Sequence, residues 1–114
     1  MNANNLLIEE ADTFQALVEE HFRARGCQLI GYVPMSPGFL LVVCRNESLQ
    51  LVYGLPGLLP VTSVDIDVCE RAIRRYDASG GYVVARSAFL PGAQSRAREL
   101  RVALIGATEL GAVN

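Results

Sequence analysis

The sequence contains no lysine, and all ten of its cationic side chains are arginine. Any chemistry that requires a lysine amine is therefore excluded. The glycines match neither a Walker loop nor a Gly-x-Gly-x-x-Gly turn, so these two kinds of nucleotide-binding loop are absent as well. The single histidine, His21, and three widely spaced cysteines, Cys27, Cys44 and Cys69, cannot supply the close-spaced ligand pairs of a structural zinc site.

Long hydrophobic runs are also missing. The longest apolar stretches are shorter than the ~20 residues that cross a bilayer. The first twelve residues, MNANNLLIEEAD, lack the basic and apolar regions of a signal peptide. Each cysteine lies in an apolar run, which is typical of a buried thiol in a reducing compartment. We therefore expect a cytoplasmic protein without a membrane contact, and the arginine-only composition suggests a GC-rich bacterial genome.

The composition is that of a folded chain. Of 114 residues, 51% are hydrophobic, which is enough for the core of one domain, and the net charge is −2. A negative net charge argues against a dedicated nucleic-acid binder but leaves a local arginine patch open. We expect a flexible segment over 1–11, a domain over 12–110 and a tail over 111–114.

The hydrophobic pattern predicts three helices and five strands. Helices are expected over 12–25, 63–77 and 91–101, and strands over 27–33, 39–45, 48–53, 81–86 and 102–105. Short connections favour an antiparallel meander for the first three strands, and the last strand–helix–strand unit favours parallel pairing. The predicted fold class is thus α/β with a mixed sheet, in the order α-β-β-β-α-β-α-β.

The loop over 54–60, GLPGLLP, is unusually apolar. Its leucines either pack beneath the domain or form an exposed surface that contacts a partner. His21 lies at the edge of the apolar stripe of the first helix, where a structural role is expected rather than that of a general base.

The stretch YVVARSAFLPGAQSRARELRVALIGATEL has a particular pattern: an apolar strand, a serine-containing loop with an aromatic, a helix with paired alanines, and a short apolar strand. Together with the predicted order over about 13–110, this pattern resembles the Mrr-type branch of the restriction endonuclease-like superfamily. The features that carry the resemblance are Val83, Val84, Ser87, Phe89, Ala93, Ala97, Leu104, Ile105 and Leu110. The resemblance implies a restriction endonuclease-like core.

The catalytic residues of that family are not present at the matching positions. The acid of the first helix falls at Gln15, the metal-binding aspartate at Leu40, and the Glu/Gln-x-Lys pair at Gln50 and Val52, so that only Gln50 is compatible. Phosphodiester cleavage of this type needs carboxylates that hold a divalent ion and a cation that stabilises the transition state. The resemblance therefore implies an inactive centre with no catalytic residue, no metal and no cofactor.

The second half carries most of the arginines. In the family, the loop after the fourth strand and the helix that follows approach nucleic acid. The candidate residues for binding nucleic acid or a partner are Arg71, Arg74, Arg75, Arg86, Ser87, Gln94 and Arg96. Either these side chains form a patch for phosphates or an acidic partner, or the arginines pair with Glu70, Asp77 and Glu99.

The expected function is that of a catalytically inactive nuclease-like interaction module, which binds a protein partner, a second copy or a nucleic acid. The resemblance implies a setting in bacterial defence or on mobile elements. One alternative is an active metal-dependent DNA nuclease whose catalytic acids have relocated among Glu9, Glu10, Glu47, Asp65 and Asp67. Another is an inhibitor that mimics a subunit of a nuclease complex. No small-molecule cofactor is expected.

Overall fold

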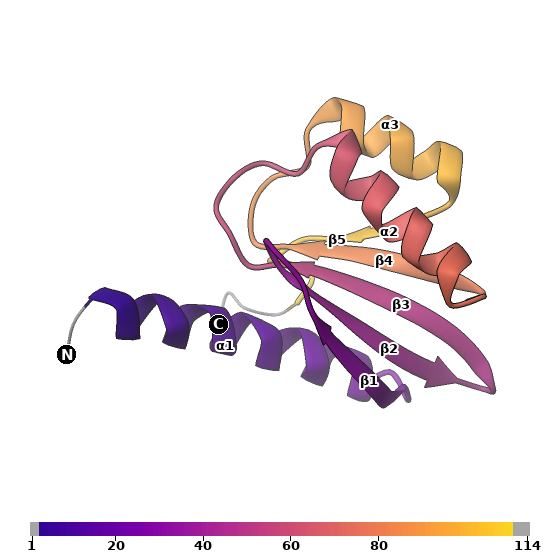
Figure 1. Cartoon of the computed structure of the whole chain (residues 1–114), viewed down its shortest axis with the longest axis horizontal. Helices are drawn as coiled ribbons and strands as arrows, with labels where there is room; N and C mark the ends of the chain where they lie inside the picture. Colours follow the sequence, from indigo (N-terminus) through magenta and orange to yellow (C-terminus); the bar gives the residue numbers. More distant parts are fainter. Residues whose placement is uncertain (1–2, 111–114) are drawn as a thin grey trace.

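A five-stranded mixed sheet forms the centre of the computed structural model, which describes residues 3–110 and their side chains from Thr13 onward (Figure 1). The elements are α1 (Ala3–Arg23), β1 (Gln28–Pro34), β2 (Phe39–Arg45), β3 (Ser48–Leu55), α2 (Ser63–Arg75), β4 (Gly80–Ala85), α3 (Pro91–Leu100) and β5 (Ala103–Ile105). The strands lie side by side in chain order, antiparallel from β1 to β3 and parallel from β3 to β5. The predicted element order and the mixed α/β sheet are confirmed.

The sheet is covered by helices on both faces. Helix α1 lies against one face, and α2 and α3 lie against the other (Figure 1). Because successive side chains of a strand point to opposite faces, β2 supplies both cores. Leu41 and Val43 belong to the α1 core, whereas Leu40 and Val42 belong to the core beneath α2 and α3. This double coverage explains why β2 is an almost continuous apolar run.

Helix α1 begins at Ala3 and not at residue 12, so the predicted start of this helix is wrong. Neither proline nor glycine interrupts the chain before Gly26, and most residues before Asp12 are compatible with a helix. The N-terminal half of α1 extends past the sheet in Figure 1. The expected flexible segment is thus helical from Ala3 onward, while residues 1–2 and the expected tail at 111–114 lie outside the described residues.

Residues at the first turns of α2 and α3 stabilise the starts of these helices. The backbone N–H of Thr62 donates to the Asp65 carboxylate at 2.9 Å, which closes the first turn of α2. Pro91 occupies the first turn of α3, where its missing N–H costs nothing. Across residues 3–110, no helix is both long enough and apolar enough to span a bilayer.

Candidate functional site

The positions that the resemblance assigns to a catalytic centre do not share one face of the sheet. In the β2–β3 pair, Leu40 lies opposite Tyr53, while Val43 lies opposite Gln50 and Leu41 opposite Val52. Directly opposed residues of an antiparallel pair point to the same face. Leu40 therefore faces α2 and α3, whereas Gln50 and Val52 face α1, so the structure does not bring these three positions together.

Both sides of the sheet centre are filled with side chains that cannot hold a cation. On the side of Leu40, its neighbours on β3 are Tyr53 and Leu55, both buried. On the α1 side, Leu41, Val43 and Val52 are fully buried. Oxygen-preferring metal ions need carboxylate or carbonyl ligands, which these side chains do not offer.

The remaining candidate position and the candidate acids are separated from one another. Gln15 donates from Nε2 to Glu19 Oε2 of its own helix at 2.9 Å. Glu47 lies in the exposed β2–β3 turn, Asp65 caps α2, and Asp67 accepts a hydrogen bond from Arg96. The side chains of Glu9 and Glu10 lie outside the described set. Among the described side chains, no group of three or more histidine, cysteine or acidic residues could hold a metal ion.

Two of the candidate arginines are used in ion pairs within the domain. The Arg74 guanidinium contacts both carboxylate oxygens of Glu70, at 2.6 and 2.7 Å, and this hydrogen bonding lowers the pKa of Glu70. Arg96 donates to Asp67 of α2 at 2.8 Å and lies 3.6 Å from Glu99. The expected pairing with Glu70 and Glu99 is confirmed, and Asp67 joins it as a partner.

Three further candidates organise loops. Arg86 donates from Nη1 to the Pro56 carbonyl at 3.2 Å, and Ser87 Oγ donates to the Leu58 carbonyl at 3.1 Å. Gln94 Nε2 donates to the Phe89 carbonyl at 3.0 Å. The first two bonds join the loop over 56–60 to the loop after β4, and the third joins α3 to the end of that second loop.

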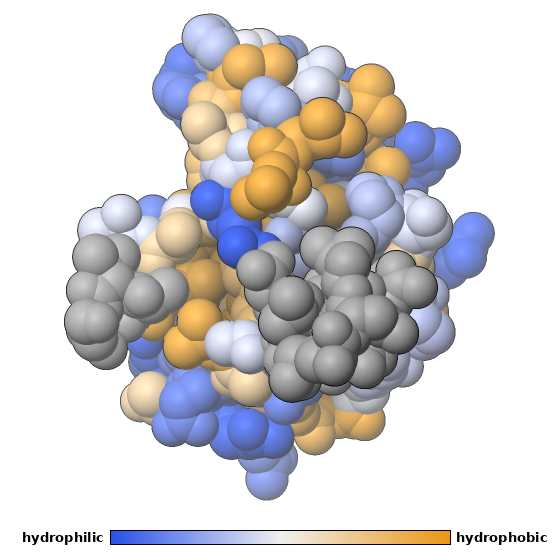
Figure 2. Space-filling model, turned by 90° about the vertical axis from the view of Figure 1, so that its left-hand side faces the viewer, coloured by the Kyte–Doolittle hydropathy of each residue, from blue (hydrophilic) through white to orange (hydrophobic). Residues whose placement is uncertain are grey.

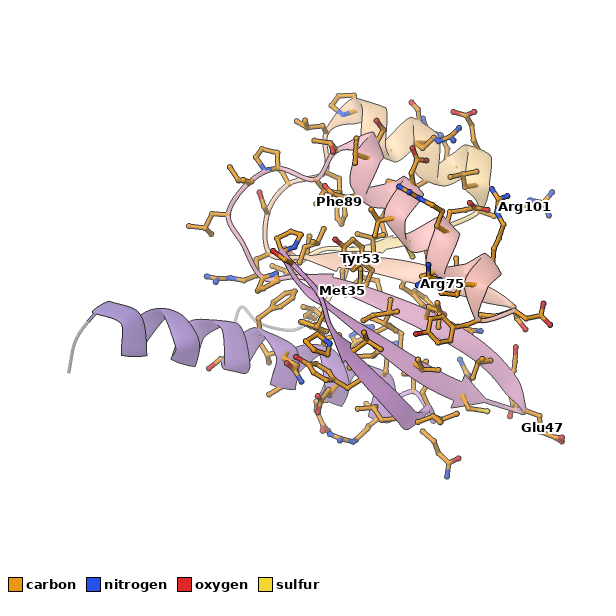
Figure 3. The ribbon with its side chains drawn as sticks, viewed as in Figure 1. Met35, Glu47, Tyr53, Arg75, Phe89 and Arg101 are labelled. Atoms are coloured by element: carbon orange, nitrogen blue, oxygen red, sulfur yellow. The ribbon has the colours of Figure 1, made fainter. Side chains whose placement is uncertain are left out.

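Arg71 and Arg75 differ from the other candidates. One turn apart on α2, they line a groove of about 340 Å³ between this helix and the turn of the β1–β2 hairpin. No carboxylate among the described side chains lies within salt-bridge distance of either guanidinium. The rest of the groove lining is mostly apolar: Val33, Met35, Leu40, Val68, Ala72 and Tyr76. Figure 3 labels Met35 on the strand side of this groove and Arg75 on the helix.

The groove exists because α2 packs over β3 and β4 and leaves β1 less covered. Strand β1 is an edge strand, and its Val33 lines the groove. The sequence identified Arg71 and Arg75 only as members of a larger arginine set. Their i, i+4 spacing predicts that they share one helix face, but no local signal indicates that this face overhangs the edge of the sheet.

The apolar loop over 54–60 is divided between the two expected arrangements. Leu55 is buried, whereas Leu58 and Leu59 are 77% and 86% exposed. Val64 at the start of α2 and Leu90 just before α3 are exposed as well. Apolar side chains gather in the upper part of the face shown in Figure 2, on the side where this loop projects. Exposed apolar groups of this kind are typical of contact surfaces.

Comparison of the chain with protein-family models, with curated proteins and with solved structures finds no match.

Proposed function

We propose that this chain is a catalytically inactive interaction module with a restriction endonuclease-like arrangement of elements, and that it binds a protein partner. The observation that carries the proposal is the β2–β3 pair, where Leu40 and Tyr53 face each other in the core. A nuclease of the resembled type would need a carboxylate on each of these neighbouring strands, on one face. The face toward α1 instead offers aliphatic side chains and the amide of Gln50, and the other face offers aliphatic side chains and the phenol of Tyr53.

The partner surface is assigned to the groove of Arg71 and Arg75. Two guanidiniums that have no ionic partner among the described side chains favour carboxylates on the bound segment, and the apolar lining favours a large hydrophobic side chain between them. The occupant with this chemistry is an acidic segment that carries an aliphatic or aromatic residue. The exposed Leu58 and Leu59 offer a second contact for the same partner or for another copy of the chain.

Nucleic acid is the weaker candidate. Arg74 and Arg96 are paired with acids, Arg86 is bonded to the Pro56 carbonyl, and the net charge is −2. A phosphate backbone needs many cations at once, because each phosphate contact adds only a modest free energy. Arg25 and Arg45 lie across the sheet from Arg71 and Arg75, so these four side chains do not form one basic face.

The test compares capture of a partner by two matched double variants. R71Q/R75Q removes two charges from the groove, and R98Q/R101Q removes two charges from α3 and its C-terminal cap. Tagged proteins are incubated with extract of the source cells, and the bound proteins are identified by mass spectrometry. We expect a partner that the wild type and R98Q/R101Q retain and that R71Q/R75Q loses. Equal capture by all three proteins, or no capture, contradicts the proposal.

The same preparations test the two alternative functions, nucleic-acid binding and DNA cleavage. Retention of DNA or RNA, with an affinity that falls with salt at a log–log slope of roughly −0.9 per phosphate contacted, would assign the surface to nucleic acid. Cleavage of plasmid DNA with Mg²⁺ or Mn²⁺ would instead support the alternative that the chain is an active nuclease with relocated catalytic acids. A place in bacterial defence or on mobile elements rests on the resemblance alone, and the identity of the partner tests it.

A further inference from the structure

A second cavity, of about 580 Å³, lies on the opposite face of the sheet, beside the C-terminal end of α1. Four separate parts of the chain contribute to it: the end of α1 and the turn after it, the end of β2, strand β4, and the segment from β5 to the following turn. The side chains that matter for its chemistry are His21, Arg25, Arg45, Tyr82, Ile105 and Glu109. None of the catalytic or binding positions that the resemblance implies lines this cavity, and it is separate from the groove of Arg71 and Arg75.

The geometry fixes the protonation state of His21. Arg25 Nη1 lies 3.2 Å from His21 Nδ1 and also donates to the His21 carbonyl at 3.1 Å. A guanidinium has only donors, so Nδ1 accepts and the ring proton is on Nε2. Burial lowers the pKa of His21, and the Arg25 charge lowers it further, while Glu109 partly opposes the shift. The imidazole is therefore a neutral ring whose remaining polar group is an N–H donor.

The charges around the cavity favour an anion. Arg25 comes from the turn after α1 and Arg45 from the end of β2, and no carboxylate in the described part of the chain lies within salt-bridge distance of either. The one acid in the lining, Glu109, accepts a hydrogen bond from the Gly106 N–H at 2.9 Å. Two guanidiniums against one carboxylate leave a net positive cavity on a protein whose net charge is −2.

One side of the cavity is aromatic. Tyr82 is partly exposed there and packs edge to face against the buried Phe22 ring, with ring centroids 4.9 Å apart. Aromatic walls of this kind bind flat apolar groups, and arginines bind carboxylates and phosphates. A cavity that combines both has the composition of a small-molecule site, with an apolar wall and a few convergent polar groups.

We propose that this cavity binds a small organic anion. The carboxylate or phosphate lies between Arg25 and Arg45, and a flat apolar body lies against Tyr82. The proposal is independent of the partner groove, because the two sites lie on opposite faces of the sheet.

His21 supplies the measurement, because it is the only histidine and its imidazole gives a single set of proton resonances. The full chain is titrated at fixed neutral pH with four probes: benzoate, phenyl phosphate, inorganic phosphate and benzyl alcohol. The first two carry both parts of the proposed ligand and differ in the anion, and the last two carry one part each. We expect saturable shifts with benzoate, phenyl phosphate or both, and at least tenfold weaker binding of inorganic phosphate and benzyl alcohol.

Variants assign the anion contact. R45Q should weaken binding of the tighter probe about tenfold, the usual effect of losing one charge-assisted hydrogen bond. R45K, which keeps the charge, should recover part of this loss, and R101Q, which removes one charge outside the cavity, should bind like the wild type. Circular dichroism checks that each variant is folded.

Three outcomes would overturn the proposal. The first is the absence of a saturable shift with either aromatic anion up to about 10 mM, well above the ~1 mM dissociation constant of a weak but specific ligand. The second is equal affinity of R45Q and R101Q. The third is inorganic phosphate that binds as tightly as the aromatic anions, which would reduce the cavity to a non-selective anion contact.

Discussion

Leu40 of β2 lies directly opposite Tyr53 of β3, and the two side chains are only 3% and 2% exposed. Burial raises the pKa of Tyr53, and the nearby Asp65 raises it further, so the phenol stays protonated. A protonated phenol and an aliphatic side chain thus face each other in this core, and neither supplies a carboxylate ligand for a metal ion. The pair contributes to packing in the core beneath α2 and α3.

Replacing Leu40 with alanine should therefore cost stability. L40A removes a buried aliphatic side chain and leaves a cavity, so the free energy of unfolding should fall by about 2–5 kcal/mol. L58A is the matched control, because Leu58 is 77% exposed, and its effect should stay within about 0.5 kcal/mol. Urea unfolding followed by circular dichroism measures both. Similar values for the two variants would show that position 40 is not part of a packed core.

Gly38 should not tolerate a side chain. A Cβ atom at Gly38 would overlap the backbone carbonyl oxygen of Gly54, at the point where β2 and β3 approach each other. Since backbone cannot move aside as a side chain does, we expect G38A to destabilise the domain by about 1–3 kcal/mol. Gly57 has open space around it, so G57A should be neutral or stabilise by up to about 1 kcal/mol. Thermal unfolding of the two variants measures both effects. A G38A variant as stable as the wild type would contradict the close approach of Gly38 to the Gly54 carbonyl.

His21 should titrate below its ordinary pKa of 6.5, because its ring is buried and next to Arg25. R25Q removes the second of these causes and should raise the pKa of His21, although burial should keep it below 6.5. E109Q removes a charge that raises the pKa and should shift it in the opposite direction. The imidazole resonances of this sole histidine give all three titration midpoints, and a wild-type midpoint above 6.5 would be incompatible with the buried neutral ring.

The same shift fixes the sign of a pH effect on stability. Between the lowered folded pKa and 6.5, the unfolded state binds more protons at His21 than the folded state does. The contribution of His21 to the free energy of unfolding is therefore constant above this window, falls as the pH drops through it, and levels off below it.

Cys69 should be unreactive in the folded protein. Burial raises the pKa of its thiol to about 12, so at about pH 8 almost no thiolate is present. Cys27 and Cys44 are partly exposed. Alkylation followed by mass spectrometry should thus modify Cys27 and Cys44 in the native protein and Cys69 only after unfolding in urea. Native labelling of Cys69 at the rate of the other two would show that α2 does not stay packed on the sheet.

The order of helices and strands was predictable because its signals are local. The apolar runs of β2 and β4, Asp65 at the start of α2 and Pro91 at the start of α3 each act within a few residues of their own position. The pairing of Arg74 with Glu70 was predictable for the same reason, since the two residues are one helical turn apart. The start of α1 was missed because neither proline nor glycine marks it and its first turns extend past the sheet.

Contacts between residues far apart in the chain could not be predicted from local signals. The residue that lies opposite Leu40 follows from the register of the hairpin, and a different register would have put other side chains there. Arg96 pairs with Asp67 because α3 packs beside α2. Arg71 and Arg75 line the groove because α2 lies beside the turn of the β1–β2 hairpin. The cavity around His21 requires the ends of α1 and β2 to meet β4 and the turn after β5. Local sequence determines which elements form, whereas burial of their apolar faces against one another determines which side chains become neighbours.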